Sequence, residues 1–254
     1  MKLWRSFVVL FSFVFFGAGS LFLGLVFFPV VSLFMKGEEK RNYLCNVVHK
    51  TWRFFTNFIE KNGSIKLNVS EKDLDYLRSL RGKVIVSNHP SYIDILLIIG
   101  LIPNTLCMAK KELKKNPVMS NIVSSLYLIN DEDKEKLKQE ADEVLKQGYN
   151  IVIFPTGTRT LEGEDMKLHK GAAMIAINSD AEIVPLHISC DYKFLAKNQK
   201  IYDADEKTVN YIITVNEKIV PSQYKKENLD DIKFRNLINS IIKERILKLT
   251  LNSY

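Results

Sequence analysis

The feature that most constrains this chain is a stretch without charged residues that covers residues 6–35. Lys2 and Arg5 precede this stretch, and Lys36 follows it. A helix needs roughly 20 apolar residues to cross the hydrocarbon core of a bilayer, and the stretch exceeds that length. We therefore expect a membrane anchor over residues 1–38 and a globular domain over residues 39–254.

The uncharged stretch allows three arrangements. It can form one transmembrane helix, or a re-entrant hairpin that enters one leaflet and turns near Gly17-Ala18-Gly19. A cleaved signal peptide is disfavoured, because strongly apolar residues resume at Leu21, directly after the small residues that cleavage would need. Basic residues flank both ends, so charge asymmetry does not choose a topology, and helix and hairpin both stay open.

Strand-like and helical patterns alternate beyond the anchor. The predicted strands cover residues 65–69, 83–87, 105–109, 127–129, 150–154, 183–188 and 209–215. The predicted helices cover residues 39–61, 71–80, 93–101, 117–125, 133–147, 171–178 and 229–249. This alternation predicts an α/β fold with a central mixed sheet and helices on both faces.

Composition narrows the class of partner. The formal net charge is +7, which suits an anionic membrane surface, an acidic carrier protein or a phosphorylated substrate. Nucleic acid is disfavoured as a partner, because no arginine-rich helix or interleaved aromatic and basic pattern is present. Cys45, Cys107 and Cys190 are widely spaced and lack metal-ligand spacing, so we expect reduced thiols in a cytoplasmic protein and no metal site.

Two polar clusters follow two of the predicted strands. The first, NHPSYID at residues 88–94, places His89 and Asp94 five positions apart. Neither a strand nor a helix brings residues at that spacing together, so they meet only if Pro90 and Ser91 turn the chain before a helix. A neutral imidazole can then accept a hydroxyl proton while the carboxylate orients the ring, as the histidine and aspartate of a serine hydrolase do.

The second cluster is FPTGTR at residues 154–159, after the apolar run 151–153. Gly157 allows the backbone to approach a ligand closely, and Thr158 offers a hydroxyl and a backbone N–H. Arg159 offers a planar fork of donors that suits a phosphate. The pair of clusters therefore indicates acyl transfer to a hydroxyl on a molecule that carries a phosphate.

Taken together, the motifs resemble the 1-acylglycerol-3-phosphate (lysophosphatidic acid) acyltransferase family. That family has an Asn-His-x4-Asp block and, later in the chain, a Phe-Pro-Glu-Gly-Thr-Arg block. Three further segments are similar to family elements: KKEL at residues 110–113, KLHKGAA at residues 167–173 and VPL at residues 184–186. The resemblance spans residues 83–188 in the family order.

The resemblance implies roles for particular residues. His89 would be the general base and Asp94 its partner, whereas Gly157, Thr158 and Arg159, with help from Lys110, would bind the acceptor. The acyl donor would be acyl-CoA or acyl carrier protein, with no further cofactor and no metal. The acceptor would be a lysophospholipid, for phospholipid biosynthesis at the cytoplasmic face of the inner membrane.

Thr156 departs from the family pattern, which has glutamate at that position. The departure puts the head group of the acceptor in doubt more than the type of reaction. Two other classes of function remain as alternatives. One is a membrane-bound lipid-binding module that is not catalytic, and the other is a hydrolase or thioesterase that uses water. A serine hydrolase is disfavoured, because the chain has no Gly-x-Ser-x-Gly elbow.

Overall fold

The structure is a computed structural model that describes residues 2–116, 120–130, 133–160, 166–191, 207–227 and 229–248. Its centre is a seven-stranded sheet with the strand order β1-β7-β6-β2-β5-β3-β4. Strands β6, β2, β5, β3 and β4 run parallel, β7 pairs antiparallel with β6, and β1 runs parallel to β7. The prediction of an α/β fold with a mixed sheet is confirmed.

The strands lie close to their predicted positions. They are β1 (Ile65–Asn68), β2 (Val84–Ser87), β3 (Thr105–Lys110), β4 (Tyr127–Asn130), β5 (Asn150–Ile153), β6 (Ile183–Cys190) and β7 (Val209–Val215). All residues of the central strands β2 and β5 are buried. Covered on both faces, such parallel strands read as uninterrupted apolar runs, which is why the sequence located them well.

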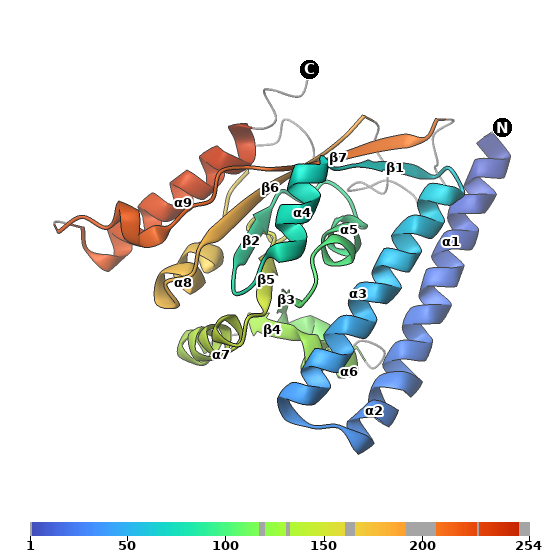
Figure 1. Ribbon diagram of the computed structural model, residues 1–254, viewed down its shortest axis with the longest axis horizontal. Coiled ribbons are helices and arrows are strands. Elements are labelled where there is room, and N and C mark those ends of the chain that lie inside the picture. Colours follow the sequence, from blue (N-terminus) through green and yellow to red (C-terminus); the bar gives the residue numbers. More distant parts are fainter. Residues whose placement is uncertain are drawn as a thin grey trace.

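Helices cover both faces of the sheet. They are α3 (Gly37–Lys61), α4 (Glu71–Ser79), α5 (Asp94–Leu101), α6 (Ser120–Leu126), α7 (Lys134–Lys146), α8 (Gly171–Asn178) and α9 (Asp231–Lys248), with short 3₁₀ turns η2 (Lys111–Lys115) and η3 (Pro221–Tyr224). Figure 1 shows α7, α8 and α9 on one side of the sheet and α3, α4 and α5 on the other. The sheet therefore lies between two helical layers, and its core is sealed from both sides.

Local signals set the helix ends. The side chain of Asp133 accepts a hydrogen bond of 3.0 Å from the backbone N–H of Lys136 and so caps the first turn of α7. Gly148 follows that helix with φ of +86°, the left-handed conformation that glycine adopts without a steric penalty. Both ends agree with the helix that the sequence predicts over residues 133–147.

The uncharged N-terminal stretch forms one long helical rod. Helix α1 (Lys2–Phe22), the π-helical segment η1 (Leu23–Phe27) and α2 (Phe28–Phe34) follow one another directly. The turn near Gly17-Ala18-Gly19 that a re-entrant hairpin would need is absent, since α1 continues through these residues. A glycine inside a helix costs only about 1 kcal/mol, a cost that packing against a neighbouring helix can offset.

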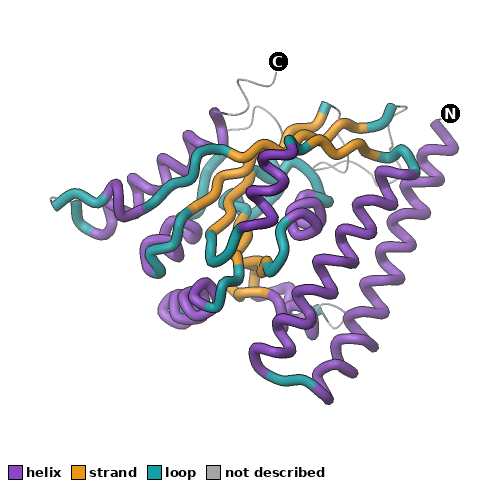
Figure 2. The backbone as a smooth tube through the Cα atoms, viewed as in Figure 1, coloured by secondary structure: helices purple, strands orange, loops and turns teal. Residues whose placement is uncertain are grey.

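The chain reverses after α2 instead. Met35 is extended and Gly37 has φ of +59°, after which α3 returns beside α1 and α2 (Figure 2). Ring contacts join the two arms, with centroid distances of 5.3 Å between Phe15 and Phe58 and 6.3 Å between Phe27 and Tyr43. The N-terminal helix is thus packed along α3.

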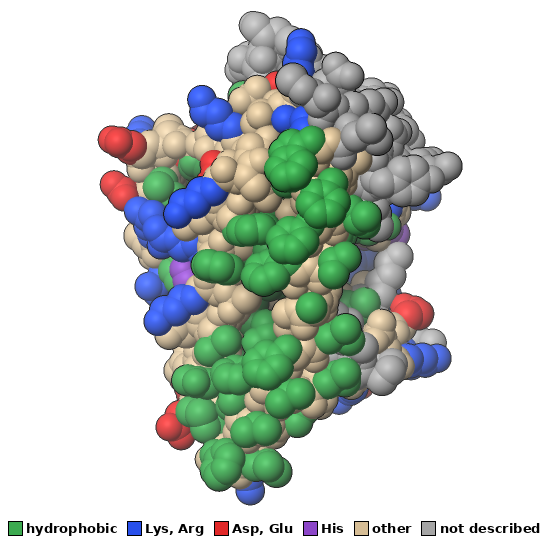
Figure 3. All heavy atoms as spheres, turned by 90° about the vertical axis from the view of Figure 1, so that its right-hand side faces the viewer, with side chains coloured by type: hydrophobic (Ala, Val, Ile, Leu, Met, Phe, Trp, Pro, Cys, Tyr) green, Lys and Arg blue, Asp and Glu red, His purple; other side chains and the backbone are tan. Residues whose placement is uncertain are grey.

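The outer side of this helical pair is apolar. Figure 3 shows a continuous band of hydrophobic side chains on the face that the N-terminal helices form. The exposed members of the band are Trp4, Phe7, Leu10, Phe11, Val14, Phe15, Leu21, Phe22, Leu25, Val26, Val30, Leu33 and Phe34, with Tyr43 and Phe54 on α3. By length and composition the helix Trp4–Phe34 could cross a membrane. Its most apolar window of 18 residues has a mean hydropathy of 2.3, and only 17% of that window is buried. A core helix of a soluble protein would instead be mostly buried.

Candidate active site

The two polar clusters meet at the carboxyl edge of the parallel strands. Strands β2 and β5 are neighbours, and their register pairs Val86 with Ile153, the last residue of β5. The loops that follow these strands therefore leave the sheet side by side. This edge, where loops emerge between adjacent parallel strands, is where α/β sheets usually place ligands.

His89 and Asp94 are joined directly, as the sequence predicts. The distance between His89 Nδ1 and Asp94 Oδ2 is 2.8 Å. Residues 88–93 turn the chain, and α5 begins at Asp94 itself. The side chain of His89 is 20% exposed, whereas that of Asp94 is completely buried. The imidazole ring is thus held through Nδ1 by a buried carboxylate, while part of the ring remains accessible to a ligand.

Ser91 completes the surroundings of the Asp94 carboxylate. Its backbone N–H donates to Asp94 Oδ2 at 2.8 Å, and its hydroxyl donates to Oδ1 at 2.6 Å. Burial raises the pKa of Asp94, and the hydrogen bonds from His89 and Ser91 oppose that rise. Because a carboxylate only accepts, the His89 nitrogen that faces it carries the proton, which leaves Nε2 as the acceptor.

The residue before the histidine is fixed to the neighbouring strand. The side-chain amide of Asn88 donates to the carbonyl of Ile188 at 2.7 Å and accepts from the N–H of the same residue at 2.7 Å. These two bonds extend the β2–β6 pairing past its last paired residues, Ser87 and Leu186. Asn88 therefore anchors the start of the histidine loop to β6.

The second cluster forms a tight turn. Gly157 has φ of +66°, and its N–H donates to the Phe154 carbonyl at 2.9 Å. Gly157 and Thr158 are both exposed at the tip of this turn, whereas Thr156 is buried within it. The Thr156 side chain therefore faces the interior of the turn instead of solvent.

Three contacts connect the two clusters. The rings of His89 and Phe154 stack with 4.2 Å between centroids, and the N–H of Thr160 donates to the His89 carbonyl at 3.0 Å. The guanidinium carbon of Arg159 lies 3.4 Å from the ring centroid of Tyr92. The structure thus brings the predicted base, its carboxylate and the predicted phosphate ligand Arg159 to one site.

The remaining predicted residue is Lys110. It ends β3, which is the neighbour of β5 on the side away from β2, so its backbone lies at the same edge of the sheet. Its side chain lies outside the described part of the chain. The structure therefore places the backbone of this residue near the site.

Two neighbours of the site were missed by the sequence reasoning. A Cβ on Gly157 would lie 3.2 Å from Cδ2 of His169, so this histidine borders the glycine turn. Tyr211 in β7 is fully buried, and burial together with the nearby Asp94 carboxylate raises its pKa. The similar KLHKGAA segment was a signal for His169, whereas Tyr211 had none, since β7 is remote in sequence.

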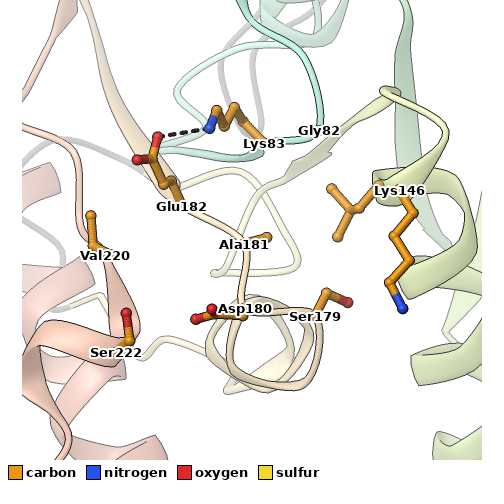
Figure 4. Close-up of a pocket in the computed structure, with 10 residues that line it drawn as sticks. Gly82, Lys83, Lys146, Ser179, Asp180, Ala181, Glu182, Val220 and Ser222 are labelled. Atoms are coloured by element: carbon orange, nitrogen blue, oxygen red, sulfur yellow. Dashed lines mark ion pairs between the residues drawn. The ribbon is translucent and has the colours of Figure 1, made fainter.

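A polar hollow lies at the opposite edge of the sheet (Figure 4). Its lining includes Lys83, Glu182 and Ser222 at the edge where β2 and β6 begin. Glu182 pairs with Lys83 at 2.8 Å and with Lys218 at 2.7 Å, so its charge is already compensated within the protein. This hollow is separated from His89 by the length of the strands.

The arrangement at the carboxyl edge suits proton transfer beside an anion. With its Nδ1 proton directed at Asp94, a neutral His89 can accept a proton at Nε2, and the carboxylate can stabilise the imidazolium that would result. Arg159 supplies a delocalised positive charge close by, with donors that match phosphate oxygens.

Comparisons with known proteins agree with this geometry. A family model described as "Acyltransferase" matches residues 68–189, which include both polar clusters. A 1-acyl-sn-glycerol-3-phosphate acyltransferase of Helicobacter pylori is 34% identical over 135 residues, which are 50% of this chain and 57% of that protein. The protein of the same description from Cocos nucifera is 31% identical over 126 residues, 45% of this chain and 40% of that protein. The chain thus spans about half the length of these curated relatives.

A solved structure is similar along almost the whole chain. The crystal structure of the 1-acyl-sn-glycerophosphate (LPA) acyltransferase PlsC from Thermotoga maritima superposes with a TM-score of 0.69, covers 98% of both chains and has 23% sequence identity. At that identity the likeness shows the fold. The motif-bearing match and the curated relatives add the sequence evidence, and together they show that residues 68–189 match the acyltransferase family and that the chain is similar to PlsC-like 1-acyl-sn-glycerol-3-phosphate acyltransferases.

Proposed function

We propose that this protein is a membrane-bound O-acyltransferase. It would transfer a fatty acyl group from acyl-CoA or acyl carrier protein to the hydroxyl of a lysophospholipid, with 1-acylglycerol-3-phosphate as the preferred acceptor. The observation that carries this proposal is the 2.8 Å contact between His89 and a completely buried Asp94, beside Arg159. The match to the acyltransferase family supports the reaction class, and Arg159 supports a phosphate on the acceptor.

The reaction needs a base, because a hydroxyl is a weak nucleophile near neutral pH. In the proposed mechanism, Nε2 of His89 takes the hydroxyl proton while the oxygen attacks the thioester carbonyl. The imidazolium is stabilised by Asp94, and the tetrahedral intermediate collapses with cleavage of the carbon–sulfur bond. His89 then returns its proton to the departing thiolate, so the histidine ends the cycle neutral.

Release of free thiol from acyl-CoA tests the proposal. The purified protein in mild detergent would be assayed with lysophosphatidic acid, with other lysophospholipids and without an acceptor. We expect acceptor-dependent thiol release that falls by about 10²-fold or more in His89→Ala, the usual range for loss of a general base. Burial raises the pKa of Cys107, which keeps this protein thiol unreactive in the assay.

Matched variants separate loss of chemistry from loss of fold. His49 donates from Nδ1 to the Ile99 carbonyl between α3 and α5, so His49→Ala controls for removal of a histidine. Arg78 lies on α4, before the amino-terminal end of β2, so Arg78→Ala controls for Arg159→Ala. Release that does not depend on an acceptor would indicate a thioesterase. Binding of acceptor without release from either acyl donor would indicate a lipid-binding module.

We further propose that residues 1–38 attach the protein to the membrane as an anchor. The apolar band of Figure 3 would enter one leaflet of the inner membrane, with residues 39–254 as the acyltransferase domain on the cytoplasmic side. A full crossing is disfavoured, because α3 accompanies the anchor and carries charged residues such as Lys50, Arg53 and Glu60. A charge at the bilayer centre costs about 2.5–3.5 kcal/mol even on permissive scales.

Tryptophan fluorescence tests this attachment. The chain has two tryptophans, and Trp4 is 68% exposed on the apolar band. In a Trp52→Phe variant, Trp4 is the remaining tryptophan. Lipids that carry bromine on their acyl chains would quench its emission if Trp4 lies among those chains. We expect quenching from vesicles that carry these lipids and recovery of the protein with the vesicles on sedimentation. Labelling of Lys2 by an amine reagent confined to the side of the membrane opposite the domain would contradict a one-leaflet arrangement.

A further inference from the structure

Tyr92 is exposed at a place where its neighbours are buried. Ser91 and Ile93 are 1% and 7% exposed, whereas Tyr92 is 55% exposed. The residue lies in the loop between His89 and Asp94, so its position along the chain is set by the loop that forms the candidate base and its carboxylate. Core packing does not account for an aromatic ring placed outward at this point.

Tyr92 makes a ring contact with Arg159. The guanidinium carbon lies 3.4 Å from the ring centroid, which is the separation of a stacked pair. Stacking uses the flat face of the guanidinium, and its N–H donors lie in the plane of the group. Tyr92 can therefore restrict the orientation of Arg159 without consuming the donors that would bind a phosphate.

The stacked pair also bridges the two loops of the site. Tyr92 belongs to the loop after β2 and Arg159 to the loop after β5, and the bond from Thr160 N–H to the His89 carbonyl joins the same loops. The Arg159 guanidinium is thus positioned relative to His89 and not only relative to its own turn. A group bound by Arg159 would be positioned with respect to the base.

We propose that Tyr92 is a positioning residue of the acceptor site, which holds the Arg159 guanidinium so that it binds the phosphate of the acceptor. This inference rests on the proposed function and identifies the ring of Tyr92, not its hydroxyl, as the part that matters. It predicts that the contribution of Tyr92 depends on the presence of Arg159 and on a phosphate in the ligand.

Equilibrium binding tests the inference separately from turnover. Calorimetric titration of lysophosphatidic acid into the full-length protein in detergent would be compared with titration of monoacylglycerol, which has no phosphate. We expect Tyr92→Leu to weaken lysophosphatidic acid binding about two- to fivefold, the range for an exposed cation–π pair, and Tyr92→Phe to bind as the unaltered protein does. Monoacylglycerol binding should be the same in all three proteins.

A double-mutant cycle with Arg159→Ala identifies the route of the effect. If Tyr92 acts through Arg159, Tyr92→Leu adds no further loss in the Arg159→Ala background. Additive losses, an equal loss in Tyr92→Phe, or no loss in Tyr92→Leu would each overturn the inference. Tight, Tyr92-dependent binding without acyl transfer would leave the inference intact and refute the proposed function. Absence of phosphate-dependent binding in the unaltered protein would refute both.

Thiol release gives an independent readout. Because Tyr92 touches neither His89 nor Asp94 in any described contact, Tyr92→Leu should raise KM for lysophosphatidic acid by the same factor and leave kcat within about twofold. A fall in kcat with unchanged KM would show instead that the substitution disturbs the base loop, and would overturn the positioning role.

Discussion

The hydroxyl of Thr156 donates a hydrogen bond of 2.8 Å to the backbone carbonyl of Thr158. Thr156 is only 6% exposed, so the side chain closes the glycine turn from within and is not presented to solvent. The residue that replaces the usual glutamate of the family therefore has a conformational task in this chain. It holds the backbone that carries Gly157 and Arg159.

Loss of that hydroxyl should loosen the turn. Thr156→Val keeps the shape of the side chain and removes the donor, so we expect a loss of about 1 kcal/mol in the free energy of unfolding and a severalfold rise in KM for the acceptor. Thr156→Ser retains the donor and should stay close to the unaltered protein. Urea unfolding and acceptor titration measure the two effects, and equal behaviour of the two variants would show that the hydrogen bond is unimportant.

Gly157→Ala should be more harmful than a comparable glycine substitution elsewhere. At Gly157 the substitution has two costs. The backbone has φ of +66°, which a residue with a Cβ adopts only with strain, and the new Cβ would lie 3.2 Å from the His169 ring. Gly148 has φ of +86° with no atom within 4 Å, so Gly148→Ala reports the cost of the conformation alone, about 1 kcal/mol. Thermal unfolding of both variants measures the difference. His169→Ala in the Gly157→Ala background should recover part of it, and no recovery would mean that the ring does not crowd the turn.

Asp94→Asn should separate activity from stability. The amide can donate to the Ser91 hydroxyl and accept from its backbone N–H, so the local hydrogen bonds can be kept. Without the negative charge the His89 imidazolium loses its partner, and we expect thiol release to fall by about 10²-fold or more. Because burial disfavours the ionised carboxylate, the variant should be at least as stable as the unaltered protein near neutral pH.

The raised pKa of Asp94 should also make the free energy of unfolding depend on pH. The folded-state pKa of Asp94 is raised, so its contribution to stability is fully present below about 4, the ordinary aspartate pKa, and declines as pH rises through the folded-state pKa. The free energy of unfolding of the unaltered protein, relative to Asp94→Asn, should therefore fall across that interval. A relative stability that rises with pH would contradict the assignment.

The contribution of Glu182 to stability should change with pH in the opposite direction to that of Asp94. Hydrogen bonds from Lys218 and Lys83 hold its pKa below the ordinary value, so its contribution is present above about 4.3 and lost as pH falls through the folded-state pKa. We expect Glu182→Gln to lose about 0.5–1 kcal/mol at pH 7 and nothing in acid. Glu135→Gln, which removes a carboxylate that is 78% exposed, is the matched control. Acceptor-dependent activity should be unchanged in both, because the hollow of Figure 4 lies at the far edge of the sheet.

The sequence was sufficient for most of the fold because its signals are local. The buried strands β2 and β5 are apolar runs, and α7 carries its own cap at Asp133 and its own stop at Gly148. The meeting of His89 and Asp94 was also accessible, since five residues that contain a proline leave few ways to join a strand to a helix. These features depend on interactions between residues close together in the chain.

Other features depended on which distant segments pack together. The N-terminal helix runs straight through Gly17 and turns at Met35–Gly37, because its packing against α3 outweighs the helix propensity of single glycines. Only the pairing of β2 with β5 placed Tyr92 against Arg159, and only β7 delivered Tyr211 to the neighbourhood of Asp94. The sequence alone thus determined the elements and the candidate base, whereas strand order decided the site around it, because contacts across a sheet leave no local trace in the chain.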